Sequence, residues 1–248
     1  MEITLNDIGA AYRGDTVLHE INWVIKPGVT TLLGENGAGK TTLLSVLVGL
    51  MRPTSGTITT TYTLDTPSRE FEPRFGFVPQ QLSLLGGMRV IDTVSYAAWI
   101  NGIPRHACER IATLALSVVS LPSTTGSRVR SLSPGQRRLL GVAASLVHDP
   151  DVLVLDEPTA GLVPAEQSVV RDAIAALGST RPVLLSTCTP QDLRPLGGRV
   201  AILAGGRLIF DGRLEKAEPA LAAWRAGGAE PESGQTRSGV TATIREEV

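Results

Sequence analysis

The sequence predicts an α/β fold built around a parallel sheet, and three stretches carry this prediction. Residues 29–33 (VTTLL) are continuously β-branched or apolar, as in a strand buried on both faces. A glycine-rich turn joins them to a helical pattern over residues 40–50. A second apolar strand, DVLVLDEP at 151–158, precedes another helical pattern over 164–178. Strands that alternate with helices in this way form a parallel sheet covered by helices.

The rest of the chain extends this organisation. Further short strands are expected at residues 2–5, 21–25 and 57–62. From about residue 85 to residue 145 the patterns are mainly helical, which predicts an inserted helical subdomain. Periodicity then continues to about residue 225, and the Gly-, Glu- and Ser-rich stretch 226–248 is expected to be a flexible tail. The predicted folded domain is therefore residues 1–225.

Composition narrows the class of protein. The chain has 248 residues and 42% hydrophobic residues, enough for a large packed core. Its net charge of −1 offers no basic field for nucleic acid, so no nucleic-acid partner is expected. No apolar run approaches the roughly 20 residues of a membrane span, which favours a cytoplasmic location. The two cysteines, Cys108 and Cys188, lie far apart and show no metal-binding pattern.

The glycine-rich turn has the pattern of a phosphate-binding loop. Its glycines let the backbone wrap a phosphate closely, and the N-terminus of the following helix adds positive charge. Lys40 is expected to bridge the β- and γ-phosphates of a nucleotide, and the Thr41 hydroxyl to bind Mg²⁺. The nucleotide-binding positions of this loop are Gly34, Asn36, Gly37, Ala38, Gly39, Lys40, Thr41 and Thr42.

The second apolar strand ends in two carboxylates. Because parallel strands present their carboxyl ends at one edge of a sheet, Asp156 and Glu157 are expected near the phosphate-binding loop. Asp156 is placed to hold Mg²⁺, and Glu157 to polarise a water for attack on the γ-phosphate. The loop and the strand together predict an ATPase that uses ATP and Mg²⁺.

Four motifs in order, GENGAGKT, VPQQ, LSPGQ and VLVLDEP, give the chain a resemblance to the nucleotide-binding domain of ABC ATPases over about residues 2–215. The resemblance implies a P-loop NTPase core of the ABC ATPase type, with an N-terminal antiparallel β portion and an inserted α-helical subdomain. It also implies that two such domains sandwich two ATP molecules. Each site then combines the phosphate loop of one domain with the LSGGQ-like signature of the other.

The resemblance assigns further positions. Tyr12 matches the aromatic residue that stacks on adenine, although an aromatic side chain there also suits core filling. Gln80 matches the glutamine that reaches Mg²⁺ and the attacking water, with Gln81 as the alternative register. The signature is LSPGQ here, and its nucleotide-binding positions are Ser133, Gly135 and Gln136. Pro134 falls at the first position of a helix, where its missing N–H costs little.

Two positions depart from the family pattern. Val163 stands where an aspartate usually follows Walker B in the D-loop, and Cys188 stands where the switch histidine of the H-loop usually contacts the γ-phosphate. A thiol is a weak donor and is shorter than imidazole. Losing one hydrogen bond to transition-state charge costs about 10²–10³ in rate, so slow hydrolysis is expected. Cys108 lies on an amphipathic helix and is interpreted as structural.

The sequence therefore predicts the ATP-binding and ATP-hydrolysing subunit of a bacterial ABC transporter, of the export type. It would act with separate membrane subunits and with a second nucleotide-binding domain, as a homodimer or heterodimer, on the inner face of the cell membrane. Residues 88–100 either receive a coupling helix or form subdomain core. The alternative functions are a nucleotide-gated binding module, or the degenerate half of a heterodimer; a DNA- or ribosome-acting ABC protein is disfavoured.

Overall fold

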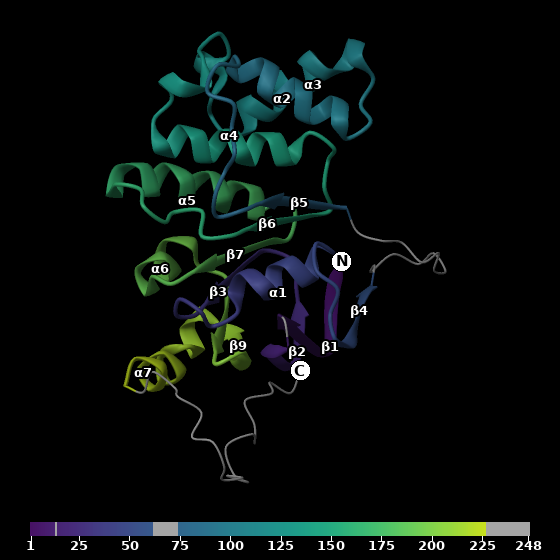
Figure 1. Ribbon diagram of the computed structural model, residues 1–248. Helices are drawn as coiled ribbons and strands as arrows, with labels where there is room; N and C mark the ends of the chain where they lie inside the picture. Colours follow the sequence, from purple (N-terminus) through teal and green to yellow (C-terminus); the bar gives the residue numbers. More distant parts are fainter. Residues whose placement is uncertain (13, 62–73, 227–248) are drawn as a thin grey trace.

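The computed structural model describes residues 1–12, 14–61 and 74–226, which form two sheets and a set of helices (Figure 1). The strands are β1 (Glu2–Tyr12), β2 (Asp15–Ile25), β3 (Val29–Leu33), β4 (Ser55–Thr61), β5 (Phe75–Val78), β6 (Val152–Leu155), β7 (Val183–Thr187), β8 (Arg199–Ala204) and β9 (Arg207–Arg213). The helices are α1 (Lys40–Leu47), α2 (Val90–Ile100), α3 (Arg105–Val118), α4 (Pro134–Leu146), α5 (Pro164–Gly178), α6 (Leu193–Leu196) and α7 (Glu218–Ala226).

The larger sheet has six strands in the order β5-β6-β7-β3-β8-β9, and every pairing is parallel except that of β8 with β9. Strand β6 shows why its sequence is continuously apolar. Leu153 and Leu155 pack in one hydrophobic cluster with α4 and α5, whereas Val152 and Val154 pack in another with α1 and the N-terminal sheet. Both faces of the sheet are therefore covered, and the predicted α/β core is confirmed.

The smaller sheet is antiparallel, with the order β2-β1-β4, and confirms the N-terminal antiparallel portion. Strands β1 and β2 are much longer than the expected segments 2–5 and 21–25. The sequence pattern breaks at an irregularity after Leu5, where Asp7 adopts a left-handed conformation with φ of 50°. Asn22 accepts from the Asp7 N–H and donates to its carboxylate, at 3.0 and 2.7 Å. This exchange lets the hairpin continue through the irregularity.

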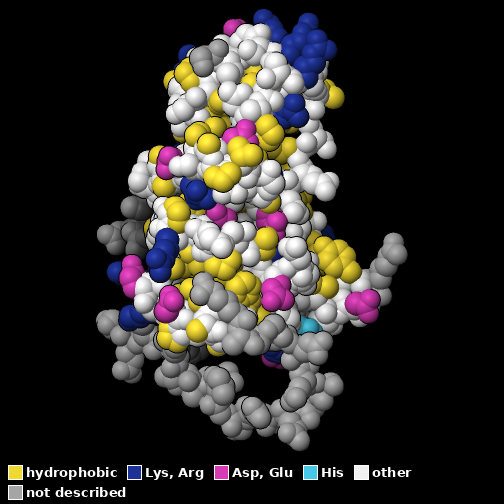
Figure 2. Space-filling model, turned by 90° about the vertical axis from the view of Figure 1, so that its left-hand side faces the viewer, with side chains coloured by type: hydrophobic (Ala, Val, Ile, Leu, Met, Phe, Trp, Pro, Cys, Tyr) yellow, Lys and Arg dark blue, Asp and Glu magenta, His cyan; other side chains and the backbone are white. Residues whose placement is uncertain are grey.

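Helices α2, α3 and α4 pack together at one end of the molecule, above α5 in Figure 1. Their buried residues belong to the same hydrophobic cluster as Val78, Leu153 and Leu185 of the sheet. The predicted helical subdomain thus shares one continuous core with the strands. Lys and Arg side chains gather at this end on the face shown in Figure 2, and charges of both signs mix over the rest of that face.

Two expectations concern the C-terminal boundary of the folded domain and the absence of a membrane span. Helix α7 ends at Ala226, one residue after the predicted end of the folded domain. The predicted tail otherwise lies outside the described residues, so the boundary stays a prediction. Within the described part of the chain, no helix combines the length and the apolar composition needed to cross a bilayer.

Candidate functional site

The loop between β3 and α1 is shaped by glycines. Gly39 caps α1 with φ of 100°, a conformation that a side chain would strain, and a Cβ there would lie 2.9 Å from Leu18. A Cβ at Gly34 would lie 2.6 Å from the Leu203 carbonyl oxygen. The loop backbone is therefore held tightly between β2 and the end of β8. This is the geometry that a loop wrapped around an anion needs.

Lys40 is the buried cation of this loop, with 5% of its side chain exposed. Its Nζ donates to the carbonyl oxygens of Gly34 and Glu35 at 2.9 and 3.0 Å. It also forms an ion pair with Glu157 Oε1 at 3.2 Å. The ammonium group thus lies inside its own loop and against the carboxylate that follows β6. The structure brings together the two charged groups that the sequence assigned to phosphate binding and to water activation.

The end of β6 fixes both carboxylates. Asp156 is 1% exposed, and its Oδ2 accepts from the Thr41 hydroxyl at 2.8 Å. Ser186, on β7, donates to Asp156 Oδ1 at 2.5 Å and accepts from the Glu157 N–H at 2.8 Å. Glu157 adopts φ of 46°, which is rare for a residue with a side chain. Such strain persists where surrounding contacts impose it, and it is frequent at functional sites.

Gln80 reaches the same point from the loop after β5. Its Nε2 donates to Glu157 Oε2 at 3.0 Å, which favours Gln80 over the alternative Gln81. Arg138 of α4 donates to the carbonyl oxygens of Pro79 and Gln80 at 3.1 and 3.0 Å. Burial lowers the pKa of Arg138, and the Asp156 and Glu157 carboxylates partly oppose this shift. A buried guanidinium therefore ties the glutamine loop to α4.

Cys188 follows β7 and is half-buried. Its Sγ lies 3.8 Å from Thr189 Oγ1. The preceding Thr187 donates to Asp192 Oδ2 at 2.8 Å and accepts from the Thr189 N–H at 3.0 Å. Thr159, two residues after Glu157, donates to the same Asp192 oxygen at 2.9 Å. A buried carboxylate thus connects the turn that carries Cys188 to the loop that follows Glu157.

Comparison with known proteins identifies this arrangement. Residues 18–160, more than half of the chain, match the ABC transporter family model. The Nod factor export ATP-binding protein I of Burkholderia pseudomallei is 32% identical over 85% of this chain and 70% of its own length. The chain belongs to the ABC transporter family. Its fold and its class of enzyme, an ABC ATPase, are therefore as predicted.

Two further similarities define what the chain covers. Human phospholipid-transporting ATPase ABCA3 is 35% identical over 73% of this chain, which spans only 11% of that relative. A structure of cbiO1 from Clostridium perfringens, part of the ABC transporter complex cbiONQ, is 26% identical. It superimposes with a TM-score of 0.76 over 90% of this chain and 93% of its own. The chain therefore corresponds to the ATP-binding cassette.

The ABC signature lies away from the phosphate loop. Ser133 caps α4 and exchanges hydrogen bonds with Gln136 in a complete capping box, and Pro134 takes the first helical position as expected. The strands β5 to β7 separate α4 from α1 in Figure 1. Within this chain, therefore, Ser133, Gly135 and Gln136 do not join the Lys40 site.

The other predicted nucleotide-binding residues differ in how far they are buried. Asn36, Gly37 and Ala38 line a cavity of about 190 Å³ together with Trp224 of α7. Thr42 is buried in the first turn of α1. Tyr12 is 50% exposed at the end of β1. Its ring is therefore only half-buried, and adenine stacking by Tyr12 stays a prediction.

The structure also bears on the interpretations of segment 88–100 and of Cys108. On α2, Val90, Val94 and Ala98 are buried in the core, whereas Tyr96 and Trp99 are 53% and 45% exposed. The segment 88–100 is thus subdomain core on one face only. Cys108 is also buried, and its thiol donates to backbone carbonyl oxygens, as the structural interpretation requires.

The oxygen atoms near Lys40 fit Mg²⁺ bound together with a nucleotide. The Thr41 hydroxyl and the Asp156 carboxylate already meet at 2.8 Å, and both are hard oxygen ligands. The described residues contain no group of three or more His, Cys, Asp or Glu side chains that could hold a metal ion alone. Mg²⁺ typically binds one or two protein groups, waters and substrate phosphates.

Sequence reasoning assigned no role to three residues of the site: Ser186, Arg138 and Asp192. Each forms contacts between segments that are far apart in the sequence. Ser186 precedes Cys188 by two residues, so its place on an apolar strand beside the switch position was a usable signal. Arg138 was detectable as a charged residue on the apolar face of α4. Nothing local distinguishes Asp192.

Proposed function

We propose that this chain is the ATP-hydrolysing subunit of an ABC transporter of the exporting type. The observation that carries the proposal is one set of contacts: Lys40 with Glu157, Gln80 with Glu157, and Thr41 with Asp156. The name of one relative, the Nod factor export ATP-binding protein I, supports export over import. Separate membrane subunits would then supply the transport path, with this chain bound at the inner face of the membrane.

Each residue of the site has a task in this reaction. The loop N–H groups and Lys40 bind the β- and γ-phosphates, so that Lys40 moves from Glu157 to the nucleotide. Glu157 is then free to accept a proton from the attacking water, and Gln80 orients that water. Thr41 and Asp156 would hold Mg²⁺, which would neutralise phosphate charge when bound. Ser186 holds the Asp156 carboxylate and the Glu157 backbone N–H through its two hydrogen bonds.

A second cassette completes the proposed site. Because Ser133 and Gly135 lie away from Lys40 of the same chain, their donors serve the γ-phosphate of ATP bound to another cassette. Tyr12 stacks on adenine, and Asn36, Gly37 and Ala38 add backbone contacts. Cys188 supplies a weaker donor than histidine at the γ-phosphate, so hydrolysis is slow. The exposed aromatic face of α2, with Tyr96 and Trp99, is the proposed contact with a membrane subunit.

Steady-state Mg-ATP hydrolysis by the full chain tests the function. Glu157→Gln preserves the shape of the side chain but removes the base, so turnover should fall by about 10²–10⁴-fold. Binding of a fluorescent ATP analogue should persist, because Lys40 and Thr41 remain. The control is Glu109→Gln, the same chemical change at an exposed position on α3, and it should match the wild type. Equal turnover in the wild type and Glu157→Gln would contradict the proposed role of Glu157.

The second candidate function is a nucleotide-gated binding module. A related form of it is the degenerate half of a heterodimer, with little hydrolysis of its own. The observations in its favour are Cys188 and Val163, which is 59% exposed and caps α5 without a side-chain hydrogen bond. Glu157 opposes it, because a module without hydrolysis has no use for a positioned carboxylate. Saturable ATP binding without turnover above the Glu157→Gln background would favour this second function.

A further inference from the structure

The signature end of α4 already holds a carboxylate from within the chain. Glu166, in the first turn of α5, accepts a hydrogen bond from the Gly135 N–H at 3.1 Å. Hydrogen bonds from Ser133, Gly135 and Val163 lower the pKa of Glu166, with that from Ser133 contributing most. A carboxylate of the same chain therefore engages the Gly135 N–H of the signature.

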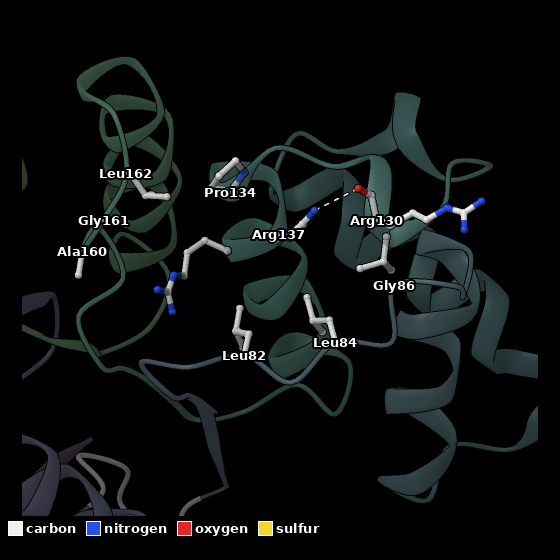
Figure 3. A pocket seen from close by; sticks show the side chains of 11 residues that line it. Leu82, Leu84, Gly86, Arg130, Pro134, Arg137, Ala160, Gly161 and Leu162 are labelled. Atoms are coloured by element: carbon white, nitrogen blue, oxygen red, sulfur yellow. Dashed lines mark hydrogen bonds between the residues drawn. The ribbon is translucent and has the colours of Figure 1, made fainter.

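The contact is close as well as polar. A Cβ placed on Gly135 would lie 2.8 Å from Glu166 Cβ and 3.1 Å from its Cγ and Cδ. Only glycine lets the stem of Glu166 pack against the start of α4. Beside this contact, Pro134 and Leu162 line a cavity of about 360 Å³ between α4 and the loop that enters α5 (Figure 3). Glu166 thus binds the start of α4 to the start of α5.

These donors are the ones that the proposed function assigns to the γ-phosphate of a second cassette. A carboxylate and a phosphate cannot share them, because the hydrogen bonds are the same and like charges repel. We infer that Glu166 is an autoinhibitory residue: its carboxylate occupies the Gly135 N–H at the start of α4 and must leave when ATP of the opposing cassette arrives. This inference rests on the proposed function.

The carboxylate does not lose all its partners when it leaves. Glu166 is the third residue of α5, and the backbone of Val163, the N-cap residue of that helix, also lowers the pKa of its carboxyl group. An acidic side chain at this position favours a helix N-terminus. Glu166 can therefore release α4 and still cap α5. This second role makes the exchange between carboxylate and phosphate reversible, as a resting-state contact requires.

ATP-driven dimerisation of the full chain tests the inference. Glu157→Gln serves as the parent, so that ATP persists, and sedimentation velocity gives the Mg-ATP concentration at half-maximal dimer. Adding Glu166→Gln removes the charge but keeps the length of the side chain, and should lower that concentration by about tenfold. Adding Asp172→Asn instead, the same charge change on α5, should leave the parent value. A fluorescent ATP analogue should bind equally to all three monomers.

Each other outcome has a defined meaning. In one of them, the parent forms dimers while Glu166→Gln needs an equal or higher Mg-ATP concentration for half-maximal dimer. That result overturns the inference and leaves the proposed function intact. Nucleotide binding without a dimer in any variant overturns the shared site, and with it the inference. Thermal unfolding checks that the variants fold. If Glu166→Gln does not fold, Glu166→Asp replaces it in the test. This variant keeps the charge on a shorter side chain that reaches Gly135 poorly, and it should also lower the Mg-ATP concentration at half-maximal dimer.

Discussion

Lys40 and Glu157 form an ion pair and neutralise each other's charge. Both side chains are almost fully buried, and a buried charge without a partner is costly. Their 3.2 Å pair therefore offsets the cost of burying both charges. In the proposed reaction, phosphate binding would draw Lys40 away from Glu157 and leave that carboxylate next to Gln80 and the attacking water. The ion pair would then link nucleotide binding to release of the base.

Cys188 gives the clearest prediction for a single residue. Histidine at this position offers a longer side chain and a stronger donor for the γ-phosphate. If Cys188 is the weakened switch residue, Cys188→His should raise the turnover number by about 10²-fold and leave nucleotide affinity nearly unchanged. Cys108→His is not a suitable control because Cys108 is buried, whereas Cys188→Ser keeps the size and should remain slow. Unchanged turnover in Cys188→His would show that another group does this work.

Among the elements, α5, β7 and α6 are joined by the buried pair of Arg171 and Asp192, 2.9 Å apart and 16% and 3% exposed. Arg171→Met leaves the Asp192 carboxylate with only two threonine donors. We expect the free energy of unfolding in urea to fall by about 3 kcal/mol. Arg207→Met removes an exposed pair with Glu20 and should cost less than about 1 kcal/mol. A similar loss in both variants would contradict a special role for Asp192.

Sequence reasoning succeeded where one segment carries its own signal. The phosphate loop and the strand ending at Asp156 are short, contiguous and chemically distinctive, so their positions and contacts were predictable. No strand was predicted at β5, β8 or β9, although Gly205 and Gly206 between two apolar runs are a hairpin signal. Sequence reasoning also could not predict the Glu166 contact, because a single acidic residue in a first helical turn is ordinary until the fold brings it to α4.

At the scale of the whole molecule, the β8–β9 turn holds the two sheets and the phosphate loop together. Gly206 accepts from the His19 N–H of β2 at 2.9 Å and donates to the Ala38 carbonyl of the loop at 3.2 Å. A Cβ on Gly206 would lie 2.0 Å from the Val17 carbonyl oxygen, so only glycine fits between these segments. The N-terminal sheet and the predicted phosphate loop are therefore joined through the backbone of this one turn.

The pH dependence of the unfolding free energy should report on the ion pair of Arg199 with Asp211, which joins β8 to β9. Burial raises the pKa of Asp211 on β9, and the Arg199 guanidinium at 3.1 Å only partly offsets the shift. A carboxyl group whose pKa is higher in the folded state stabilises the fold below its unfolded pKa of about 3.8, and this contribution is lost as pH rises through the folded pKa.

Asp211→Asn removes the titrating group and tests this expectation. The unfolding free energy of the wild type relative to Asp211→Asn should therefore fall as pH rises from 3.8 through the raised pKa, and then level off. Urea titrations at successive pH values measure this difference, with Asp172→Asn as the exposed control. A difference that instead increases with pH would mean that Arg199 outweighs burial and lowers the pKa of Asp211.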